Sequence, residues 1–299
     1  MKQSYYEASA RARVAGILDP STFQEMLPPA DRVTSPHLKA LDLPAAFDDG
    51  VVIGRGMVEG RAVLIAAQEG GFMGGAVGEV HGAKIVGLLE RAAREHPVAV
   101  LLLLESGGVR LQEANAGLIA VSEVMRAILA ARVAGVPVLA AIGGQFGCFG
   151  GMGIAARCCD AIVMSEEGRL GLSGPEVIET ANGVEEFDSR DRALVWRTVG
   201  GKHRYLIGDC DRLVDDDIAE FRSALLALAR AAEAFTLATV VREHEMLKRR
   251  IASFGACDDA LDVWRALGWD DPGLVSTIDA AEFSQRAAAR HGGLPLVAR

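Results

Sequence analysis

Cysteine, aromatic residues and long apolar runs are all scarce in this sequence of 299 residues, and each scarcity excludes a class of protein. The cysteines are Cys148, Cys158, Cys159, Cys210 and Cys257. This odd set holds no Cys-x-x-Cys pair, so neither a disulfide framework nor a zinc ribbon is expected. The longest apolar run, residues 98–104, is too short to cross a bilayer, and the first residues have no signal-peptide core. We therefore expect reduced, mostly structural thiols, a cytoplasmic chain and no membrane partner.

Long basic runs and low-complexity linkers are also missing. The net charge is -9 and the isoelectric point is near 5.3, which argues against nucleic acid as the main partner. Half of the residues are hydrophobic and 24% are charged, as in a globular chain with a large core. We expect one α/β domain over residues 1–299, with a helical C-terminal part from about residue 217.

Several catalytic motifs are absent. The sequence contains no G-x-x-x-x-G-K-[ST] phosphate loop, no G-x-S-x-G nucleophile elbow and no H-E-x-x-H metal motif. Its six histidines are scattered, so no metal site is expected. Gly151-x-Gly153-x-x-Ala156 imitates a dinucleotide fingerprint after a strand, but its helix would be only about two turns long before Asp160.

Alternating β-branched runs and helical periodicities give a coarse secondary structure. A hairpin turning at Glu59-Gly60 is expected over residues 51–68, and Pro97 should end a helix that begins near residue 78. Pro175 should open a later helix in its first turn. The other expected elements are strands at 98–104, 136–144 and 160–166 and helices at 111–134, 152–159 and 218–250.

Twice, a buried strand ends in Gly-Gly and leads into a helix, at Gly107-Gly108 and at Gly150-Gly151. Such turns direct backbone N–H groups and a helix N-terminus toward the strand ends, where they can hold a phosphate or an oxyanion. A single pair of this kind more often serves only a tight turn. Two pairs after adjacent strands favour a site, so we predict that these four glycines are catalytic.

Acid and base groups are less clear. Glu79 and His81 lie at the start of a helix beside a glycine-rich loop, where capping and acid–base roles both stay open. Ser106 has no evident base in the sequence, which makes it a weak nucleophile candidate. Arg110 and Gln112 are interpreted as residues that fix the turn.

Four segments in the right order resemble the carboxyltransferase branch of the crotonase-like superfamily. "ARARVAGILDPSTFQEM" resembles the A-R-E-R-I-x-x-L-L-D-x-G-S-F entry segment, and "GFMGGAVGEVHGAKIVGLLERA" resembles F-x-G-G-S-x-G-E-x-H-x-x-K-I. "ESGGVRLQEA" is similar to S-G-G-A-R-x-Q-E, and "FGGMGIAA" with "DAIVMSEEGRLGLSGPEVIE" is similar to the strand and helix ending in G-P-x-V-I-E. The resemblance covers about residues 8–182 and implies a spiral of ββα repeats, of the type found in acyl-CoA carboxylase carboxyltransferase N-domains.

Departures from the family pattern indicate which group within the superfamily the sequence resembles most. Acetyl-CoA carboxylase β chains carry a zinc ribbon that is missing here, and single-chain carboxyltransferases hold two such domains. The sequence is most similar to β subunits of biotin-independent malonate decarboxylases, whose γ subunits resemble the second domain. Ala76 replaces the usual Ser, and Val109 replaces the usual Ala.

This resemblance implies decarboxylation of a malonyl thioester on an acyl carrier protein, giving acetyl thioester and CO2 through an enolate. It implies three partners: a γ-like carboxyltransferase subunit, the acyl carrier protein with its phosphopantetheine-like arm, and an acyl-transferase subunit. We expect no cofactor on this chain itself. The expected substrate-binding residues are Phe72, Met73, Gly74, Gly75, Ala76, Ser106 and Val109.

Three questions stay open at the level of sequence. The proton donor to the enolate could be a bound water, a partner-chain residue, or one of Glu79, His81, Glu105 and Glu113. A carboxyltransferase that passes the carboxyl group to biotin on another protein is the main alternative function. A non-catalytic scaffold subunit is the second alternative.

Overall fold

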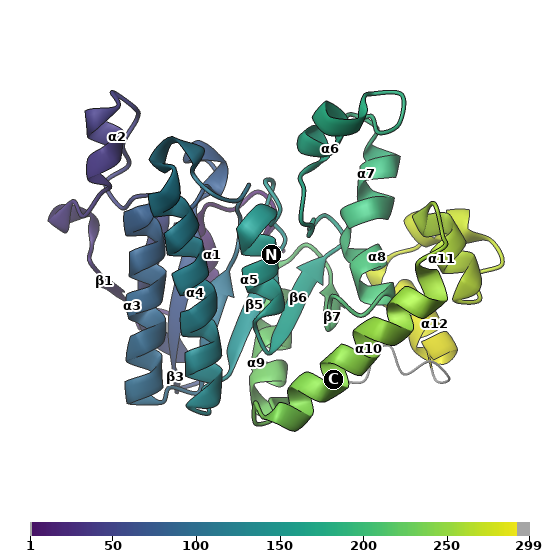
Figure 1. The fold of residues 1–299 in the computed structure, drawn as a ribbon. Helices are drawn as coiled ribbons and strands as arrows, with labels where there is room; N and C mark the ends of the chain where they lie inside the picture. The colour runs from purple at the N-terminus through teal and green to yellow at the C-terminus, as the bar shows by residue number, and fades with distance from the viewer. Residues whose placement is uncertain (1, 292–299) are drawn as a thin grey trace.

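A seven-stranded sheet, in which the strand order follows the chain order, forms the centre of the computed structural model (Figure 1). The structure describes residues 2–291, and side chains as far as residue 287. The strands are β1 (Gln24–Met26), β2 (Val51–Val58), β3 (Arg61–Gln68), β4 (Ala99–Leu103), β5 (Val138–Ile142), β6 (Ala161–Ser165) and β7 (Arg212–Val214). β1, β2 and β3 pair antiparallel, and the pairs from β3 to β7 are parallel.

The β2–β3 hairpin confirms the turn predicted at Glu59-Gly60. Both turn residues have positive φ, 49° and 71°, as a two-residue turn between twisted strands requires. Val58 and Arg61 are then paired directly across the turn.

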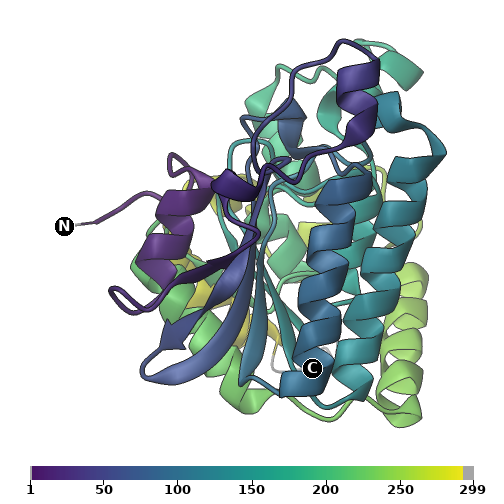
Figure 2. The same cartoon turned by 90° about the vertical axis from the view of Figure 1, so that its left-hand side faces the viewer.

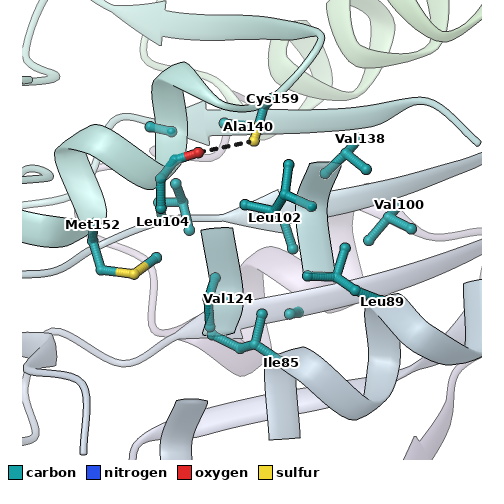
Figure 3. Packing of buried hydrophobic residues seen from close by; sticks show 14 of the residues in the cluster. Ile85, Leu89, Val100, Leu102, Leu104, Val124, Val138, Ala140, Met152 and Cys159 are labelled. Atoms are coloured by element: carbon teal, nitrogen blue, oxygen red, sulfur yellow. Dashed lines mark hydrogen bonds between the residues drawn. The ribbon is translucent and has the colours of Figure 1, made fainter. Parts of the chain in front are cut away.

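Helices cover both faces of the sheet, as Figure 2 shows edge-on. One face carries α3 (Glu79–Glu95), α4 (Asn115–Val133) and α5 (Gly150–Arg157), and the other carries α1 (Ala10–Ile17) and α9 (Ile218–Ala231). Because both faces are covered, β4, β5 and β6 are buried at every position, which explains their unbroken apolar runs. Leu102 and Leu104 of this core pack with Ile85 and Val124 of the helices (Figure 3).

The ββα repeat expected from the resemblance is visible in the backbone pairing. After each central strand the chain makes a second, short extended segment before its helix. These segments pair in parallel through isolated bridges, Val77 with Val109, Ser106 with Cys148, and Cys148 with Leu170. The segments stack as a second ladder at the carboxyl ends of the sheet strands.

Helix α2 (Pro36–Ala40) lies near β1, at the opposite end of the sheet from β7 (Figure 1). The other helices extend the fold beyond β6 and β7. They are α6 (Pro175–Asn182), α7 (Arg192–Val199), α8 (Gly201–Leu206), α10 (Leu237–Phe254), α11 (Ala260–Ala266) and α12 (Ala280–His291). Helix α6 begins with Pro175 in its first turn, as predicted. A separate apolar cluster around Trp264 and Phe283 holds the C-terminal helices together. In the described part of the chain, no helix combines the length and apolar character needed to span a membrane.

Three predicted boundaries were wrong. The helix expected at 111–134 is broken at Ala114, whose φ is 48°, so a 3-10 turn (Leu111–Glu113) precedes α4. The helix expected at 218–250 is two helices, because Thr236 and Thr239 form a capping box that starts α10 anew. Gly150 and Gly151 do not precede a helix but form the first turn of α5.

Candidate functional site

Three glycine-rich segments meet beyond the carboxyl ends of β3, β4 and β5, and we call residues 74–77, 106–109 and 148–151 the glycine cluster. The Gly107 N–H donates to the Gly74 carbonyl at 2.8 Å, and the Phe149 N–H donates to the Ser106 carbonyl at 2.8 Å. A Cβ added to Gly150 would lie 3.1 Å from the Gly108 Cα, so the two Gly-Gly turns are in contact. The structure thus brings together the turns that the sequence singles out.

Glycine is required at both contact points for backbone reasons. Gly108 has φ of 120° and Gly150 has φ of 59°, conformations that residues with a Cβ rarely adopt. A Cβ on Gly150 would also crowd the Gly108 Cα, at 3.1 Å.

The N–H groups of the cluster divide into bonded and unbonded ones. Gly108 donates to the Ser106 Oγ at 3.1 Å, and Gly150 donates to the Leu172 carbonyl at 2.9 Å, so these two groups and that of Gly107 are already engaged. Within residues 2–291, the N–H groups of Gly74, Val109 and Gly151 have no acceptor, and the last two belong to the touching Gly-Gly turns. The pairing pattern explains this, because the Val77–Val109 bridge uses the Val77 N–H and C=O with Gly108 and Arg110 and leaves the Val109 N–H outside the bridge.

Val109 and Gly151 are therefore the two available donors at the contact of the turns. Each follows directly after a glycine of the touching pair, and both residues are partly exposed, whereas Gly108 is buried. Gly151 is in the first turn of α5, where the helix dipole adds partial positive charge. Two such donors can stabilise a single developing oxyanion. The catalytic role of the four glycines stays a prediction. The N–H groups of Gly107, Gly108 and Gly150 are already bonded, so Gly151 is the one of the four with an available donor within residues 2–291, and Val109 adds a second.

The loop of predicted substrate-binding residues, 72–76, is wedged against the turn at 105–108. A Cβ added to Gly75 would run into the Glu105 carbonyl, and Met73 and Gly74 also have positive φ, at 50° and 65°. The Ala76 carbonyl accepts a bond from Arg110 Nη2 at 3.2 Å, and Ala76 itself is half-buried. The loop is thus held in one conformation, and its role in binding substrate stays a prediction.

Ser106 is fully buried, and its hydroxyl is used locally. Its Oγ accepts the Gly108 N–H and lies 3.3 Å from the Gly108 carbonyl. Among the side chains that the structure describes, no basic group contacts this hydroxyl. The geometry argues against Ser106 as a nucleophile.

Arg110 is a buried structural cation, as the sequence interpretation had it. Its Nη1 lies 3.1 Å from the Asp49 carboxylate and 2.7 Å from the Glu113 carboxylate, and all three side chains are fully buried. The guanidinium also lies 5.3 Å from the centre of the Phe72 ring. Arg110 thereby connects the turn after β4 to the start of β2 and to loop 72–76.

Two of the candidate proton donors are held in this network. Burial and the nearby Arg110 lower the pKa of His81 to about 3, so its ring is neutral at physiological pH. The ring accepts from the Gln68 amide at 3.1 Å and donates to the Asp49 carbonyl at 3.0 Å. Burial alone would raise the pKa of Glu113, but the Glu79 N–H and Arg110 hold it below its usual value. Neither group is a ready proton donor at neutral pH.

The other two candidate proton donors, Glu79 and Glu105, differ in their access to solvent. Glu105 is buried in an ion pair with Arg13, whereas the Glu79 side chain is 52% exposed and contacts His37 Nε2 at 2.6 Å. Of the four side chains considered, Glu79 alone is accessible. The open alternatives for the proton donor are therefore Glu79, a partner-chain residue and water.

Arg13 and Gln68 were missed at the level of sequence. Arg13 occupies a position in the buried stripe of α1, with Ala10, Val14 and Ile17. A charged residue on such a stripe is the signal that could have marked it, because buried charges are almost always paired. Gln68 is the last residue of β3 and accepts the Glu105 N–H at 3.1 Å.

Comparison with known proteins decides the family. A model of the carboxyl transferase domain matches residues 7–234. The chain belongs to this family, the crotonase-like carboxyltransferases. Among curated family members, it is 42% identical to the malonyl-S-ACP:biotin-protein carboxyltransferase of Malonomonas rubra, over 95% of this chain and 96% of that protein. It is 33% identical to the acetyl-coenzyme A carboxylase carboxyl transferase subunit beta of Fusobacterium nucleatum, over 58% of this chain and 59% of the relative.

Solved structures of the carboxyltransferase family agree with the fold. A Pseudomonas malonate decarboxylase hetero-tetramer contains a chain that matches with a TM-score of 0.82 and 42% identity, over 89% of this chain and 97% of that one. A chain of a Pseudomonas malonate decarboxylase hetero-dimer matches with a TM-score of 0.66 and 40% identity, over 83% and 96% of the two chains. The resemblance to crotonase-like carboxyltransferases and the fold class, both predicted from motifs, are confirmed. The relatives of this chain within the family act on carboxyl groups.

Proposed function

We propose that this chain is the β subunit of a malonate decarboxylase and that it forms the enolate-stabilising half of the site. The observation that carries the proposal is the pair of unbonded N–H groups at Val109 and Gly151 on two touching glycine turns. The near full-length similarity to chains of Pseudomonas malonate decarboxylase supports the choice of substrate.

The reaction requires stabilisation of negative charge more than a strong base. When the bond between the α-carbon and the carboxyl group of a malonyl thioester breaks, its electron pair enters an enolate and CO2 leaves. The Val109 and Gly151 N–H groups would hold the thioester oxygen as it becomes negative. A proton then adds to the α-carbon and gives the acetyl thioester, with Glu79, a partner residue or water as the donor.

Transfer of the carboxyl group to biotin is the second candidate, because the Malonomonas rubra relative is a malonyl-S-ACP:biotin-protein carboxyltransferase. The enolate step is common to both reactions, so the glycine cluster suits either. The two differ only in the fate of the carboxyl group.

A partner chain is proposed on the face that surrounds the glycine cluster. Large apolar side chains are exposed there on the segments next to the turns, which is unusual for a free surface. They are Leu111, Leu118, Ile119, Ile154, Leu172 and Val177. We propose a γ-like carboxyltransferase subunit at this face and a carrier protein that presents the malonyl thioester on a phosphopantetheine-like arm. An acyl-transferase subunit completes the proposed assembly. The hetero-tetramer and hetero-dimer of the Pseudomonas relatives support a hetero-oligomer in general.

One assay separates the candidates. The chain is purified with its γ-like partner and incubated with a malonyl thioester, with and without avidin, while CO2 and acetyl thioester are measured. Avidin-resistant release of both products supports the decarboxylase. Loss of CO2 release with avidin supports transfer to biotin, and no thioester turnover under any condition would leave the chain as a scaffold.

A further inference from the structure

We infer that the buried ion pair between Arg13 and Glu105 is the positioning element of the glycine cluster. Glu105 directly precedes the Ser106-Gly107-Gly108 turn, and Arg13 reaches it from α1 on the other face of the sheet. The inference rests on the proposed function, because it assigns these residues a part in placing the Val109 and Gly151 donors.

The pair is buried and fully engaged. The Arg13 and Glu105 side chains are 1% and 5% exposed, and Arg13 Nη1 bonds to Glu105 Oε2. Arg13 Nε donates to the Tyr5 carbonyl at 2.9 Å, and its guanidinium lies 4.6 Å from the centre of the Tyr5 ring. The other oxygen of Glu105 accepts the Phe146 N–H at 3.1 Å. One carboxylate therefore links the N-terminal segment, the turn after β4 and the loop after β5.

The surrounding loops are shaped to this carboxylate. A Cβ added to Gly70 would lie 2.6 Å from the Glu105 Cδ, and a Cβ added to Gly144 would collide with the same carboxylate and approach Arg13 Nη2 to 2.7 Å. The absence of side chains at both glycines lets the two loops close on the ion pair. The Phe146 ring then lies against Gly70 and near Gly74, at the edge of the predicted substrate loop.

Stability alone is a poor reason for such a pair. Removing two charges from water is so unfavourable that apolar replacements of a buried ion pair are often neutral or stabilising. What an apolar pair cannot supply is the bond that the Phe146 N–H donates to the Glu105 carboxylate, or the bond that Arg13 donates to the Tyr5 carbonyl. Since Phe146 lies only a few residues before Gly150 and Glu105 a few before Val109, this bond fixes the two donor turns relative to each other.

The test is a double variant, Arg13→Met with Glu105→Leu, prepared in the complex with the partner subunit. We expect thermal stability near that of the wild type, kcat for malonyl thioester lowered about 10- to 100-fold, and KM within about twofold, since small misplacements of catalytic groups act on turnover. Glu105→Gln, which keeps an oxygen for the Phe146 N–H but loses the charge, should show a smaller loss of kcat.

The Arg132–Asp160 pair provides the matched control. Its side chains are 10% and 11% exposed, its charged atoms are 2.7 Å apart, and Asp160 also accepts the Val138 N–H at 2.8 Å. This pair lies at the amino ends of β5 and β6, away from the glycine cluster. Arg132→Met with Asp160→Leu should leave kcat unchanged.

Hydrogen exchange in the assembled complex keeps the inference separate from the proposed function. Peptides covering residues 105–109 and 143–151 should exchange faster in the Arg13/Glu105 double variant and in Glu105→Gln, and not in the control. If the wild-type complex neither decarboxylates nor transfers carboxyl groups, the proposed function fails, while this exchange pattern still reports on positioning. Unchanged exchange together with wild-type kcat in the Arg13/Glu105 variants would overturn the inference, as would an equal loss of kcat in the control.

Discussion

At the scale of single residues, the site depends on backbone atoms more than on side chains. The titratable groups nearest to the turns are committed elsewhere: Arg110 and Glu113 to each other, and His81 to Gln68 and to the Asp49 carbonyl. At the contact of the two Gly-Gly turns, the N–H groups of Val109 and Gly151 have no acceptor within the described residues and are available for chemistry. Changing one backbone atom is therefore the sharpest test of catalysis at this site.

Replacing the amide of Val109 or of Gly151 by an ester removes one N–H donor and changes no side chain. Each replacement should lower kcat roughly 100-fold and leave thioester affinity nearly intact, because an oxyanion donor acts mainly in the transition state. The same exchange at Ala260, at the start of α11, whose N–H also has no acceptor within residues 2–291, should have no effect on turnover. Steady-state kinetics of the reconstituted complex is the measurement, and wild-type rates for both esters would move catalysis to the partner chain.

Ala76 tests the path of the substrate arm. This half-buried residue follows Gly74 and Gly75 in a loop fixed against the Glu105 carbonyl, so a larger side chain has little room to move aside. Ala76→Leu should raise KM for a malonyl thioester about tenfold and change kcat much less, as expected when a pocket becomes too small. Ala116→Leu, in the first turn of α4, serves as the control. An unchanged KM for Ala76→Leu would show that the arm takes another path.

At the scale of helices and strands, the sequence predicted the turns and helix starts that depend on the backbone preferences of neighbouring residues. The hairpin at Glu59-Gly60 and the helix start at Pro175 follow from φ preferences, and both occur as predicted. The break between α9 and α10 has no Gly or Pro to mark it and depends on a threonine capping box. The helical periodicity therefore predicted one continuous helix where there are two. The Arg13–Glu105 pair joins residues 92 positions apart, which no local pattern can show. Which N–H groups remain unbonded depends likewise on how the turns pair after folding.

The exposed apolar face around α4 should bind the partner subunit. Ile119→Asp places a charge on that face, and desolvating it on association should raise the Kd of the complex at least about tenfold, as for a central interface residue. Ile251→Asp on α10 is a control at an isoleucine that is at least as exposed, 71% against 61% for Ile119, on a different part of the surface. Light scattering of the co-expressed subunits gives the mass of each complex. An intact complex with Ile119→Asp and a dissociated one with Ile251→Asp would place the interface on α10.

At the scale of the whole molecule, two histidines that are neutral in the folded chain make its stability depend on pH. His203 is partly buried and, like His81, neutral: loss of solvent and the nearby Arg204 lower its pKa to about 3, and its Nδ1 accepts from the Trp264 Nε1 at 3.2 Å. His81 bonds to Gln68, which accepts the Glu105 N–H beside the glycine cluster, while His203 bonds to Trp264 of the C-terminal apolar cluster. Acid should therefore weaken both ends of the molecule through the same chemistry.

The free energy of unfolding should fall as the pH drops from about 6.5 to about 3. Both histidines have an ordinary pKa of 6.5 and a folded-state pKa of about 3, so in this window the unfolded chain binds protons that the folded chain does not. Each contributes a slope of up to about 1.4 kcal/mol per pH unit, and above pH 6.5 both contributions are fully present. Urea unfolding at several pH values measures the slope. His81→Gln and His203→Gln should each reduce the slope by up to about 1.4 kcal/mol per pH unit, the contribution of one proton, whatever they do to stability at neutral pH. A slope that neither histidine variant changes would mean that carboxylates alone set the acid sensitivity of this chain.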